Sequence, residues 1–340
     1  MTIPSIPNPA IPCGSTVVVT GCTGFIGSHI ADQVLAAGFK VRGTSRDATT
    51  KQWLKEYFDG KHGVGKFELV SVPDVTREDA FEEAVRGAAG FIHVAHDMNG
   101  SGDPAIAIPY TVTMAMNTLK SASAAGIKRF VYTSSSFAVT QPKPSVPFTV
   151  DERTFNEAAI AAVKEKGRDA GGATVYSASK VEVERAMQKW KDETGAKIVV
   201  NCVNPNGNLG PVLQPQHQGY PTTAGWVKNL CDGKYDALKR VPEHFIDVRD
   251  DAKLHVIALV NPKLEGRRLL GMVAPAPISK IVQILRKEYP EHRFPDFKDD
   301  GTDEITNLMK DEVEGLLKEA YGHGYTPLEE SVKANASELK

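Results

Sequence analysis

The sequence predicts an α/β protein with a doubly wound, Rossmann-type parallel sheet and a smaller, mainly C-terminal substrate lobe. From Val17 to about Val203, short β-branched runs alternate with segments that carry apolar residues at helical spacing. A turn with three glycines joins the first such run to the first helical segment. Strands that alternate with helices are typical of a parallel sheet with right-handed crossovers and helices on both faces.

The first strand, the glycine turn and the first helix form one motif. Val17–Val19 is typical of a buried strand, and Gly21, Gly24 and Gly27 follow before the helical pattern of 28–37. Glycine lets the backbone turn sharply and approach a pyrophosphate, and a helix start offers free N–H groups and a positive dipole end. A tight turn without a ligand is the alternative. Between a strand and a helix, the motif predicts nucleotide binding.

The remaining elements follow the same alternation. The other expected strands are 40–44, 67–71, 90–94, 129–133, 197–203 and 267–271. The expected helices are 50–58, 77–86, 104–126, 176–194, 252–260, 279–288 and 303–319. Two long stretches, 141–173 and 205–245, break the regularity, and long irregular stretches in a compact domain are more often functional than decorative. Because they follow strands of the sheet, we expect them to cover the crevice at its carboxyl edge.

Composition restricts the class of partner. The chain has 340 residues, is 41% hydrophobic and 24% charged, and carries a net charge of −2. This balance suits a globular core and points to neither nucleic acid nor a membrane surface, and no apolar run reaches the roughly 18 residues of a membrane span. Four cysteines without a C-x-x-C pair predict a reduced, cytoplasmic protein. Nine histidines without H-E-x-x-H spacing predict no metal. Monomer and homodimer both stay open.

The loop after the second strand indicates which nucleotide binds. NAD enzymes place an acid about 20 residues past the glycines, where it binds the ribose 2′-hydroxyl. Here Arg46 occupies that place, and an arginine fork pairs with a 2′-phosphate. The adjacent Asp47 is counter-evidence, and a solvated loop charge is the alternative for Arg46. The pattern favours NADPH/NADP⁺. We therefore expect an arm at 1–14, an NADP-binding domain at 15–204 plus 246–265, and a substrate lobe at 205–245 plus 266–340.

A tyrosine and a lysine four residues apart suggest proton transfer. Tyr176 and Lys180 share one face of the expected helix. A free tyrosine has a pKa of about 10, and a neighbouring ammonium lowers it by stabilising the phenolate. The serine run 134–136, after the fifth strand, offers a hydroxyl that can polarise a carbonyl. Taken singly, the pair is also typical of an ordinary helix and the run of a polar loop.

Together, the glycine turn, the Thr-Ser-Ser after the fifth strand and the tyrosine–lysine pair resemble the extended short-chain dehydrogenases/reductases. The segments 40–46, 128–135 and 245–250 resemble the dihydroflavonol-reductase-like branch. Within that branch, the chain is most similar to fungal NADPH-dependent aldehyde/ketone (carbonyl) reductases. The resemblance runs from about Gly14 to Ser331. It implies a reductase without specifying the substrate.

The resemblance also implies roles for individual residues. Tyr176 matches the general acid, Lys180 the lysine that lowers its pKa, and Ser135 the serine that binds the carbonyl, with Ser134 or Ser136 as alternatives. Arg46 and its helper Lys51 match the 2′-phosphate site. The other implied cofactor contacts are Gly21, Thr23, Gly24, Phe25, Ile26 and Gly27 in the turn, Asp74 and Val75 at the adenine, Ala95 after the fourth strand, and Asn204 and Pro205 at the carboxamide.

The chain departs from the family pattern near the expected substrate. Many relatives carry an asparagine early in the long helix, where this chain has Thr111, so a water relay through that position is in doubt. The polar segments after the fourth and sixth strands suggest a substrate other than a flavonoid. The candidate substrate contacts are His96, Phe137, Asn208 and Trp226, with Asp97, Met98, Val139, Leu209 and Tyr220 as further candidates. A structural role is the alternative for each.

The resulting hypothesis is NADPH-dependent reduction of a small-molecule ketone or aldehyde to an alcohol, with the proton from Tyr176. The alternatives are a hydroxysteroid/dihydroflavonol-type dehydrogenase or epimerase on the same scaffold, and a non-catalytic NADP-sensing regulator. Cys22 lies inside the glycine turn. We therefore also expect that modification of its thiol blocks cofactor binding.

Overall fold

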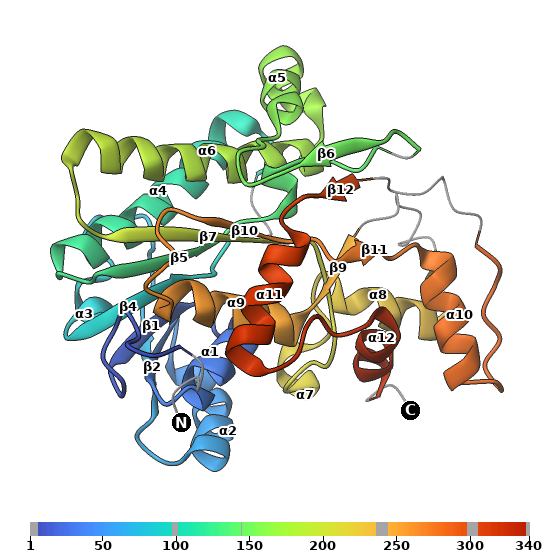
Figure 1. Ribbon diagram of the computed structural model, residues 1–340, viewed down its shortest axis with the longest axis horizontal. Helices are drawn as coiled ribbons and strands as arrows, with labels where there is room; N and C mark the ends of the chain where they lie inside the picture. Colours follow the sequence, from blue (N-terminus) through green and yellow to red (C-terminus); the bar gives the residue numbers. More distant parts are fainter. Residues whose placement is uncertain (1–5, 97–100, 144, 236–243, 298–304, 338–340) are drawn as a thin grey trace.

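The computed structural model describes residues 6–96, 101–143, 145–235, 244–297 and 305–337. Its central sheet has seven strands in the order β10-β7-β5-β4-β1-β2-β3, and every neighbouring pair is parallel (Figure 1). The strands are β1 Thr16–Thr20, β2 Lys40–Ser45, β3 Phe67–Ser71, β4 Ala88–His93, β5 Arg129–Thr133, β7 Val199–Pro205 and β10 Arg268–Gly271. The predicted fold class is confirmed.

The order of the strands sets the place of the site. The chain builds outward from β1 to β3, and then restarts on the other side of β1 with β4. Ligands of doubly wound sheets bind outside the carboxyl ends of the strands, at such a reversal. Because all seven strands are parallel, the loops that follow them meet at one edge. The glycine turn follows β1 and therefore lies at this reversal.

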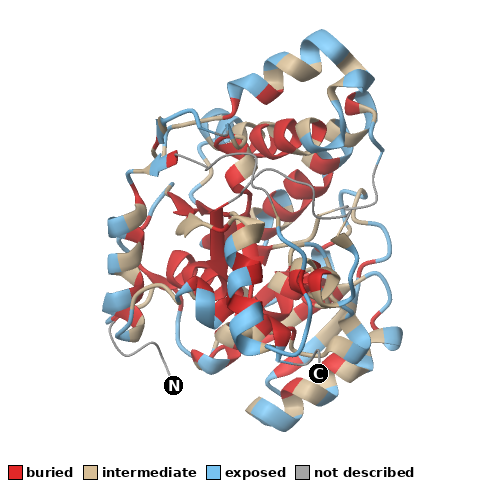
Figure 2. Cartoon of the chain, turned by 90° about the vertical axis from the view of Figure 1, so that its right-hand side faces the viewer, coloured by how far each residue is buried: buried red, intermediate tan, exposed pale blue. Residues whose placement is uncertain are grey.

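Helices cover both faces of the sheet, which explains why the three central residues of β1 are all valine. On one face, a cluster of buried side chains joins the sheet to α1 Phe25–Ala36, α2 Gln52–His62, α9 Val248–Val260 and α11 Lys310–Tyr321. On the other face, the sheet packs against α3 Glu82–Val85, α4 Pro104–Ala124 and α6 Gly172–Thr194. Figure 2 shows the buried residues concentrated in this central layer. Val17, Val18 and Val19 are each 0% exposed, as expected for a strand buried on both faces.

A smaller unit is built from residues that follow β7. Its three-stranded sheet has the order β11-β9-β8, with β8 Gly207–Leu209, β9 His244–Asp247 and β11 Ala274–Pro275. Its helices are α7 Pro215–Gln218, α8 Ala224–Cys231, α10 Ile278–Glu288 and α12 Leu328–Ala336. Apolar side chains of α8, α10 and α12 share one buried cluster. The strand β10 belongs to the central sheet, although the expected division assigns 266–340 to the substrate lobe; that division itself stays a prediction.

Two expected helices are wrong in extent. Only α3, Glu82–Val85, forms within 77–86. The amide of Asn117 on α4 donates to the carbonyls of Val75, Thr76 and Arg77, which holds the start of that stretch as a loop. The helix expected at 303–319 begins at Lys310. Before it, β12 Ile305–Asn307 pairs with β6 Phe148–Val150, a partner far away in the chain.

The two stretches expected to be irregular contain regular elements. Within 141–173 lie β6 and α5 Glu157–Lys166, and α6 begins at Gly172 rather than at residue 176. Within 205–245 lie β8, α7 and α8. Most of these elements are short, and β8 begins with Gly207 and α7 with Pro215, residue types that also mark loops. The expected arm is anchored on the core, where Ile11 is buried and the N–H of Ala10 donates to the carbonyl of Val260 at 2.8 Å.

The buried guanidinium of Arg129 binds backbone carbonyls at the C-terminal end of α9. The guanidinium of Arg129, at the start of β5, donates to the carbonyl of Leu259 at 3.0 Å, of Asn261 at 2.7 Å and of Leu264 at 2.7 Å. Helix carbonyls at a C-terminus have no partner within the helix, and a cation there also complements the helix dipole. This single side chain thus ties β5 to the helix that covers it.

We expect Arg129→Met to lower the free energy of unfolding by about 2–4 kcal/mol, because the carbonyl of Leu259 loses its donor and those of Asn261 and Leu264 each lose one of two. Urea denaturation followed by circular dichroism measures this change. Lys128→Met, at the exposed neighbouring position, is the control and should stay within about 0.5 kcal/mol of wild type. Equal effects of the two substitutions would contradict the assignment.

Candidate active site

The glycine turn is shaped by close backbone contacts. Gly21 has φ +67°, a conformation that side chains disfavour. A Cβ added to Gly21 would lie 2.9 Å from the nitrogen of Ala95, and one added to Gly27 would lie 2.1 Å from the carbonyl oxygen of Gly21. Gly24 has more room, since its nearest neighbour would be 3.4 Å away. Two glycines therefore close the turn, and the third leaves its outer side open.

The turn ends in an uncapped helix N-terminus. Gly24 is the N-cap of α1 and offers no side chain to it. Within the part of the chain that the structure describes, no hydrogen bond uses the N–H groups of Phe25 and Ile26. Free N–H groups and the positive end of a helix dipole favour a phosphate. The turn therefore fits the pyrophosphate of a dinucleotide.

Thr20, the last residue of β1, aligns the neighbouring strand end. Its hydroxyl oxygen accepts the N–H groups of Val94 at 3.0 Å and Ala95 at 3.1 Å. The same hydroxyl lies 2.8 Å from Nδ1 of the buried His93. Because Oγ1 already accepts two N–H groups, its own proton goes to Nδ1, so that His93 is the neutral Nε2–H tautomer. Burial lowers the pKa of His93 to about 3, in agreement with a neutral ring. These bonds hold Ala95 against Gly21.

Arg46 is exposed just beyond β2 and, among the described residues, makes no ion pair. Its neighbours are engaged elsewhere. Oδ1 of Asp47 accepts the N–H and the hydroxyl of Thr49, at 2.9 and 2.6 Å, and these bonds hold the pKa of Asp47 below its usual value. Arg42 pairs with Glu68. Asp47, the counter-evidence from the sequence, is thus committed to its own turn, and Arg46 is the cation available to a ligand.

The loop after β3 places Asp74 and Val75. Oδ1 of Asp74 accepts the N–H and the hydroxyl of Thr76, which lowers the pKa of the carboxyl. The amide of Asn117 donates to the carbonyls of Val75 and Thr76 and so fixes the loop from below. Asn117 escaped the sequence analysis. Its burial and its partners are visible only in the structure.

On α6, Tyr176 and Lys180 lie one turn apart and face the end of β5. Nζ of Lys180 donates to the carbonyl of Thr133 at 2.9 Å. The same nitrogen lies 5.8 Å from the ring centre of Tyr176 and 4.8 Å from that of Tyr132. Lys180 is 2% exposed, and burial lowers the pKa of its ammonium to about 7 although Glu184 acts in the opposite direction. The lysine charge is therefore held close to the tyrosine in a dry setting.

Glu184, one further turn along α6, organises the ends of two strands. Its carboxylate accepts the hydroxyl of Ser134, the amide of Asn204 at 2.8 Å and Nε of Arg268 at 2.6 Å. A buried carboxylate is stable only when paired and hydrogen-bonded, and here both conditions hold. Neither Glu184 nor Arg268 is predicted from the sequence as a site residue, although the sequence does show an acid four residues after Lys180 on the same helix face.

The three serines of 134–136 differ in their hydrogen-bond partners within this network. Ser134 donates to Glu184 and is occupied. Oγ of Ser135 accepts the N–H of Phe137 at 3.2 Å, and its carbonyl accepts the amide of Asn204 at 3.1 Å. The hydroxyl proton of Ser135 makes no bond within the described residues and stays available. Oγ of Ser136 is buried without a partner there, so Ser136 stays an alternative to Ser135.

Two of the candidate substrate residues surround Tyr176. The ring of His96 lies 5.0 Å from that of Tyr176 at 85°, and the ring of Phe137 lies 6.2 Å away at 71°. Nδ1 of His96 is buried without a partner in the described part of the chain. Burial and the charge of Lys180 lower the pKa of His96 to about 2, so the imidazole is neutral. It can exchange hydrogen bonds with a ligand without carrying charge.

The other candidates contact different surroundings. Trp226 packs on Gly207, whose added Cβ would lie 3.0 Å from the indole ring, and it borders the apolar cluster of the smaller unit. Asn208 is buried, and its amide donates to the carbonyl of Asn206. Val139 and Leu209 lie inside apolar clusters, and Tyr220 borders one. Asp97 and Met98 lie outside the described residues. The hydroxyl of Thr111 donates to the carbonyl of Ala107 within α4.

The structure argues against modification of Cys22 in the folded protein. The thiol is 0% exposed, and a Cβ added to Gly43 would lie 2.5 Å from its sulfur. Burial raises the pKa of Cys22 to about 12. A thiol reagent needs a thiolate that it can reach. In the folded protein the sulfur is enclosed and the thiol keeps its proton. Cys22 packs beneath the glycine turn as a core residue.

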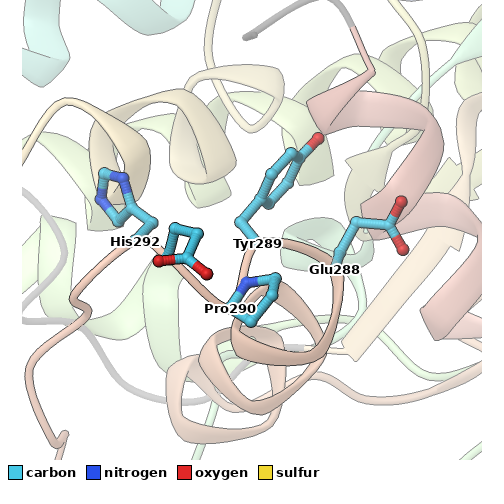
Figure 3. Close-up of a pocket in the computed structure, with 5 residues that line it drawn as sticks. Glu288, Tyr289, Pro290 and His292 are labelled. Atoms are coloured by element: carbon cyan, nitrogen blue, oxygen red, sulfur yellow. The ribbon is translucent and has the colours of Figure 1, made fainter.

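The surface also carries a hollow at the end of α10, which Figure 3 shows. Its volume is about 390 Å³, and residues 288–292 line it. None of the predicted site residues is among them. The described residues contain no group of three potential metal ligands. No helix in the described ranges is long and apolar enough to cross a membrane.

Comparison with known proteins identifies the family. Residues 17–269 match the NAD dependent epimerase/dehydratase family. The chain belongs to this family. The resemblance to extended short-chain dehydrogenases/reductases is thereby confirmed, and the matched residues contain the glycine turn, the serine run and the tyrosine–lysine pair.

Individual relatives of this epimerase/dehydratase family member cover almost its whole length. Aldehyde reductase 2 of Sporidiobolus salmonicolor is 34% identical over 96% of this chain and 97% of its own. Ketoreductase adrE of Penicillium rubens is 38% identical, also over 96% and 97%. The structure of the yeast methylglyoxal/isovaleraldehyde reductase Gre2 complexed with NADPH matches with a TM-score of 0.81 and 24% identity, over 95% of this chain and 98% of that one. This last likeness shows the shared fold.

In this family member, the buried lysine makes stability depend on pH. Burial lowers the pKa of Lys180 from 10.5, its ordinary value, to about 7 in the folded chain. Between these values the unfolded state binds more protons, so stability rises with pH, and below pH 7 the full burial penalty remains. We expect Lys180→Met to raise the melting temperature of the ligand-free protein, with a larger gain at pH 6 than at pH 9.

Thermal denaturation at the two pH values measures this gain. Lys189→Met is the matched control, because Lys189 lies on the same helix with an exposed side chain. Its effect should be small and equal at both pH values. A gain for Lys180→Met that does not change between pH 6 and pH 9 would contradict the burial of a titrating ammonium.

Proposed function

We propose that this protein is an NADPH-dependent carbonyl reductase that converts a ketone or an aldehyde into an alcohol, with Tyr176 as the proton donor. The observation that carries the proposal is the placement of Tyr176 and the buried Lys180 at the sheet edge where the glycine turn also lies. Relatives named aldehyde reductase and ketoreductase, similar over almost the whole chain, support an oxidoreductase that acts on carbonyl groups.

The chain's residues fit the cofactor from end to end. The open side of Gly24 and the free N–H groups of α1 would hold the pyrophosphate. Arg46, with Lys51, would hold the 2′-phosphate, because a guanidinium pairs with a phosphate and an acid repels it. Asp74 would take the adenine amino group with the carboxylate oxygen that Thr76 leaves free. A related yeast structure contains NADPH, which agrees with this assignment.

Asn204 would meet the carboxamide at the opposite end. Its amide nitrogen is used by Glu184 and by the carbonyl of Ser135, while its Oδ1 is buried without a partner in the described chain. An orphaned buried acceptor calls for a donor, and a carboxamide N–H₂ is one. When bound, NADPH supplies the hydride, and the chain supplies orientation and proton transfer.

The proton chemistry falls to three side chains. Tyr176 donates its hydroxyl proton to the substrate oxygen as negative charge develops there. The hydroxyl of Ser135 donates a second hydrogen bond to the same oxygen and stabilises that charge. Lys180, whose Nζ is anchored on Thr133 beside the tyrosine ring, stabilises the phenolate that remains. His96 and Phe137 border Tyr176 and would bound the substrate on that side.

Two alternatives differ in testable features. Epimerisation and dehydration on this scaffold fit the family description and relatives named NAD-dependent epimerase/dehydratase. Arg46 is exposed and has no acid partner within the described residues, which disfavours NAD and therefore argues against both reactions. A non-catalytic NADP sensor has no need for a lysine buried at an energetic cost beside a tyrosine. The retained pair favours the reductase.

We expect Tyr176→Phe to lower kcat by at least about 100-fold, because the substrate oxygen loses its proton donor. NADPH should still bind, since the substitution removes one hydroxyl and keeps the ring. The assay follows NADPH consumption with a panel of aldehydes, ketones and 1,2-dicarbonyls, and fluorescence titration follows binding. Ser177→Ala, at the next residue, is the control. A fully active Tyr176→Phe enzyme would exclude the proposed mechanism.

We expect Arg46→Ala to weaken NADPH binding by about 10- to 100-fold while NADH binding stays the same. The physical reason is the lost charge pair with the 2′-phosphate, which NADH lacks. Fluorescence titration of the same protein preparation with NADPH and with NADH measures both affinities, and NADH serves as the control. A parallel loss for NADPH and NADH would show that Arg46 acts on the fold of the loop rather than on the phosphate.

A further inference from the structure

A glutamine from the smaller unit reaches the glycine turn. Nε2 of Gln218, at the end of α7, lies 3.0 Å from the carbonyl oxygen of Gly24, 3.2 Å from that of Thr23 and 3.0 Å from Oγ of Ser28. Its Oε1 accepts the N–H of Gln214 at 3.0 Å, which fixes the orientation of the amide. Every polar atom of this side chain is therefore used, and its donors all go to the turn.

Two further contacts bind the same segment to the nucleotide-binding unit. Nε2 of His29 on α1 donates to the carbonyl of Pro211 at 2.8 Å, and burial lowers the pKa of this histidine, which keeps it neutral. The ring of His217 stacks on Trp53 of α2, with centres 4.8 Å apart and planes at 6°. The segment Pro211–Gln218 thus contacts the turn, the helix after it and the next helix along.

Apolar packing adds a contact at the start of α1. Phe25 is 4% exposed and shares a small buried cluster with Val212, Ala224 and Val248. Val212 belongs to the segment, Ala224 begins α8 and Val248 begins α9. The first residue of the helix that would face the pyrophosphate is therefore held by side chains from beyond β7.

The bond to Gly24 has a direct consequence for anion binding. A peptide unit is planar, and its N–H points opposite to its C=O. The carbonyl of Gly24 and the N–H of Phe25 belong to one such unit. That carbonyl also accepts the N–H of Ser28 at 3.0 Å, and Gln218 adds a second donor to it. Gln218 thereby reinforces the direction of the Phe25 N–H on the opposite side of the unit, which has no partner among the described residues.

We propose that Pro211–Gln218 is a strap that locks the glycine turn in its anion-binding conformation and slows release of the dinucleotide, with Gln218 as its positioning residue. The strap deepens the proposed function, on which it rests for the identity of the ligand. It couples the smaller unit to cofactor affinity through a side chain that need not touch the cofactor.

The test compares three substitutions at one position. Gln218→Met keeps the length of the side chain and removes the amide, Gln218→Ala also removes the packing, and Gln218→Glu replaces the donors with a negative charge. We expect Met and Ala to raise the Kd of NADPH about 10-fold through faster dissociation, and Glu to raise it further, because a carboxylate repels the carbonyls and the phosphates. NADH should lose affinity by the same factor, since both dinucleotides share the pyrophosphate.

The readouts separate positioning from folding. Equilibrium titration gives Kd, stopped-flow displacement gives the dissociation rate, and thermal denaturation of the ligand-free protein gives stability. Gln216→Ala is the control, because Gln216 lies on the same short helix with an exposed side chain whose one hydrogen bond among the described residues goes to Gln214. The strap is supported when Gln218→Met melts within about 2 °C of wild type and releases NADPH faster, while the control binds normally.

Other outcomes overturn the proposal. Wild-type affinity and dissociation rate in Gln218→Met and Gln218→Glu would exclude a positioning role, and so would equal effects of Gln218→Met and Gln216→Ala. A wild-type protein that binds neither dinucleotide also excludes it. Binding is measured without a carbonyl substrate. A protein that binds NADPH through an intact strap yet reduces no carbonyl would therefore refute the proposed function alone.

Discussion

The burial of the Lys180 ammonium constrains the catalytic edge of this protein. A charged nitrogen inside the molecule needs an acceptor and a compensating charge. It obtains the first from the carbonyl of Thr133, at the end of β5. The second comes from Glu184, one turn along α6, which in turn holds Ser134, Asn204 and Arg268. The buried ammonium and Glu184 therefore align one helix with the carboxyl ends of β5 and β7 and with the start of β10.

The opposite end of the edge depends on backbone rather than on charge. Gly21 and Gly27 allow contacts that no side chain would fit, and Thr20 holds Ala95 against the turn. The N-terminus of α1 stays open to an anion in consequence. Gln218 reaches this turn from the smaller unit. This contact connects cofactor affinity to the arrangement of the smaller unit. A dinucleotide site built from the first half of the chain alone would have no such connection.

Much of the central sheet was predictable, because β-branched runs and helical spacing are local signals. The same holds for the positions of Gly21, Arg46, Tyr176 and Lys180, since each lies at a predicted strand end or helix face. The errors share one cause. Ile305–Asn307 forms a strand only because β6 lies beside it, and Asn117, Glu184 and Gln218 matter through partners at least 20 residues away in the chain. The short stretch of sequence around each of these residues does not contain its partner, so a local pattern cannot predict the contact.

The sequence by itself determined the doubly wound sheet, the glycine turn and the pairing of a tyrosine with a lysine, because spacing along one strand or helix specifies each of them. The tertiary structure alone decided which polar groups are used and which stay free. In the folded chain the carboxylate of Asp47 accepts the N–H of Thr49, and the hydroxyl of Ser134 donates to Glu184. The sulfur of Cys22 is enclosed next to Gly43. Burial and hydrogen-bond partners arise from packing between distant segments, and they set the charge and the reactivity of a side chain.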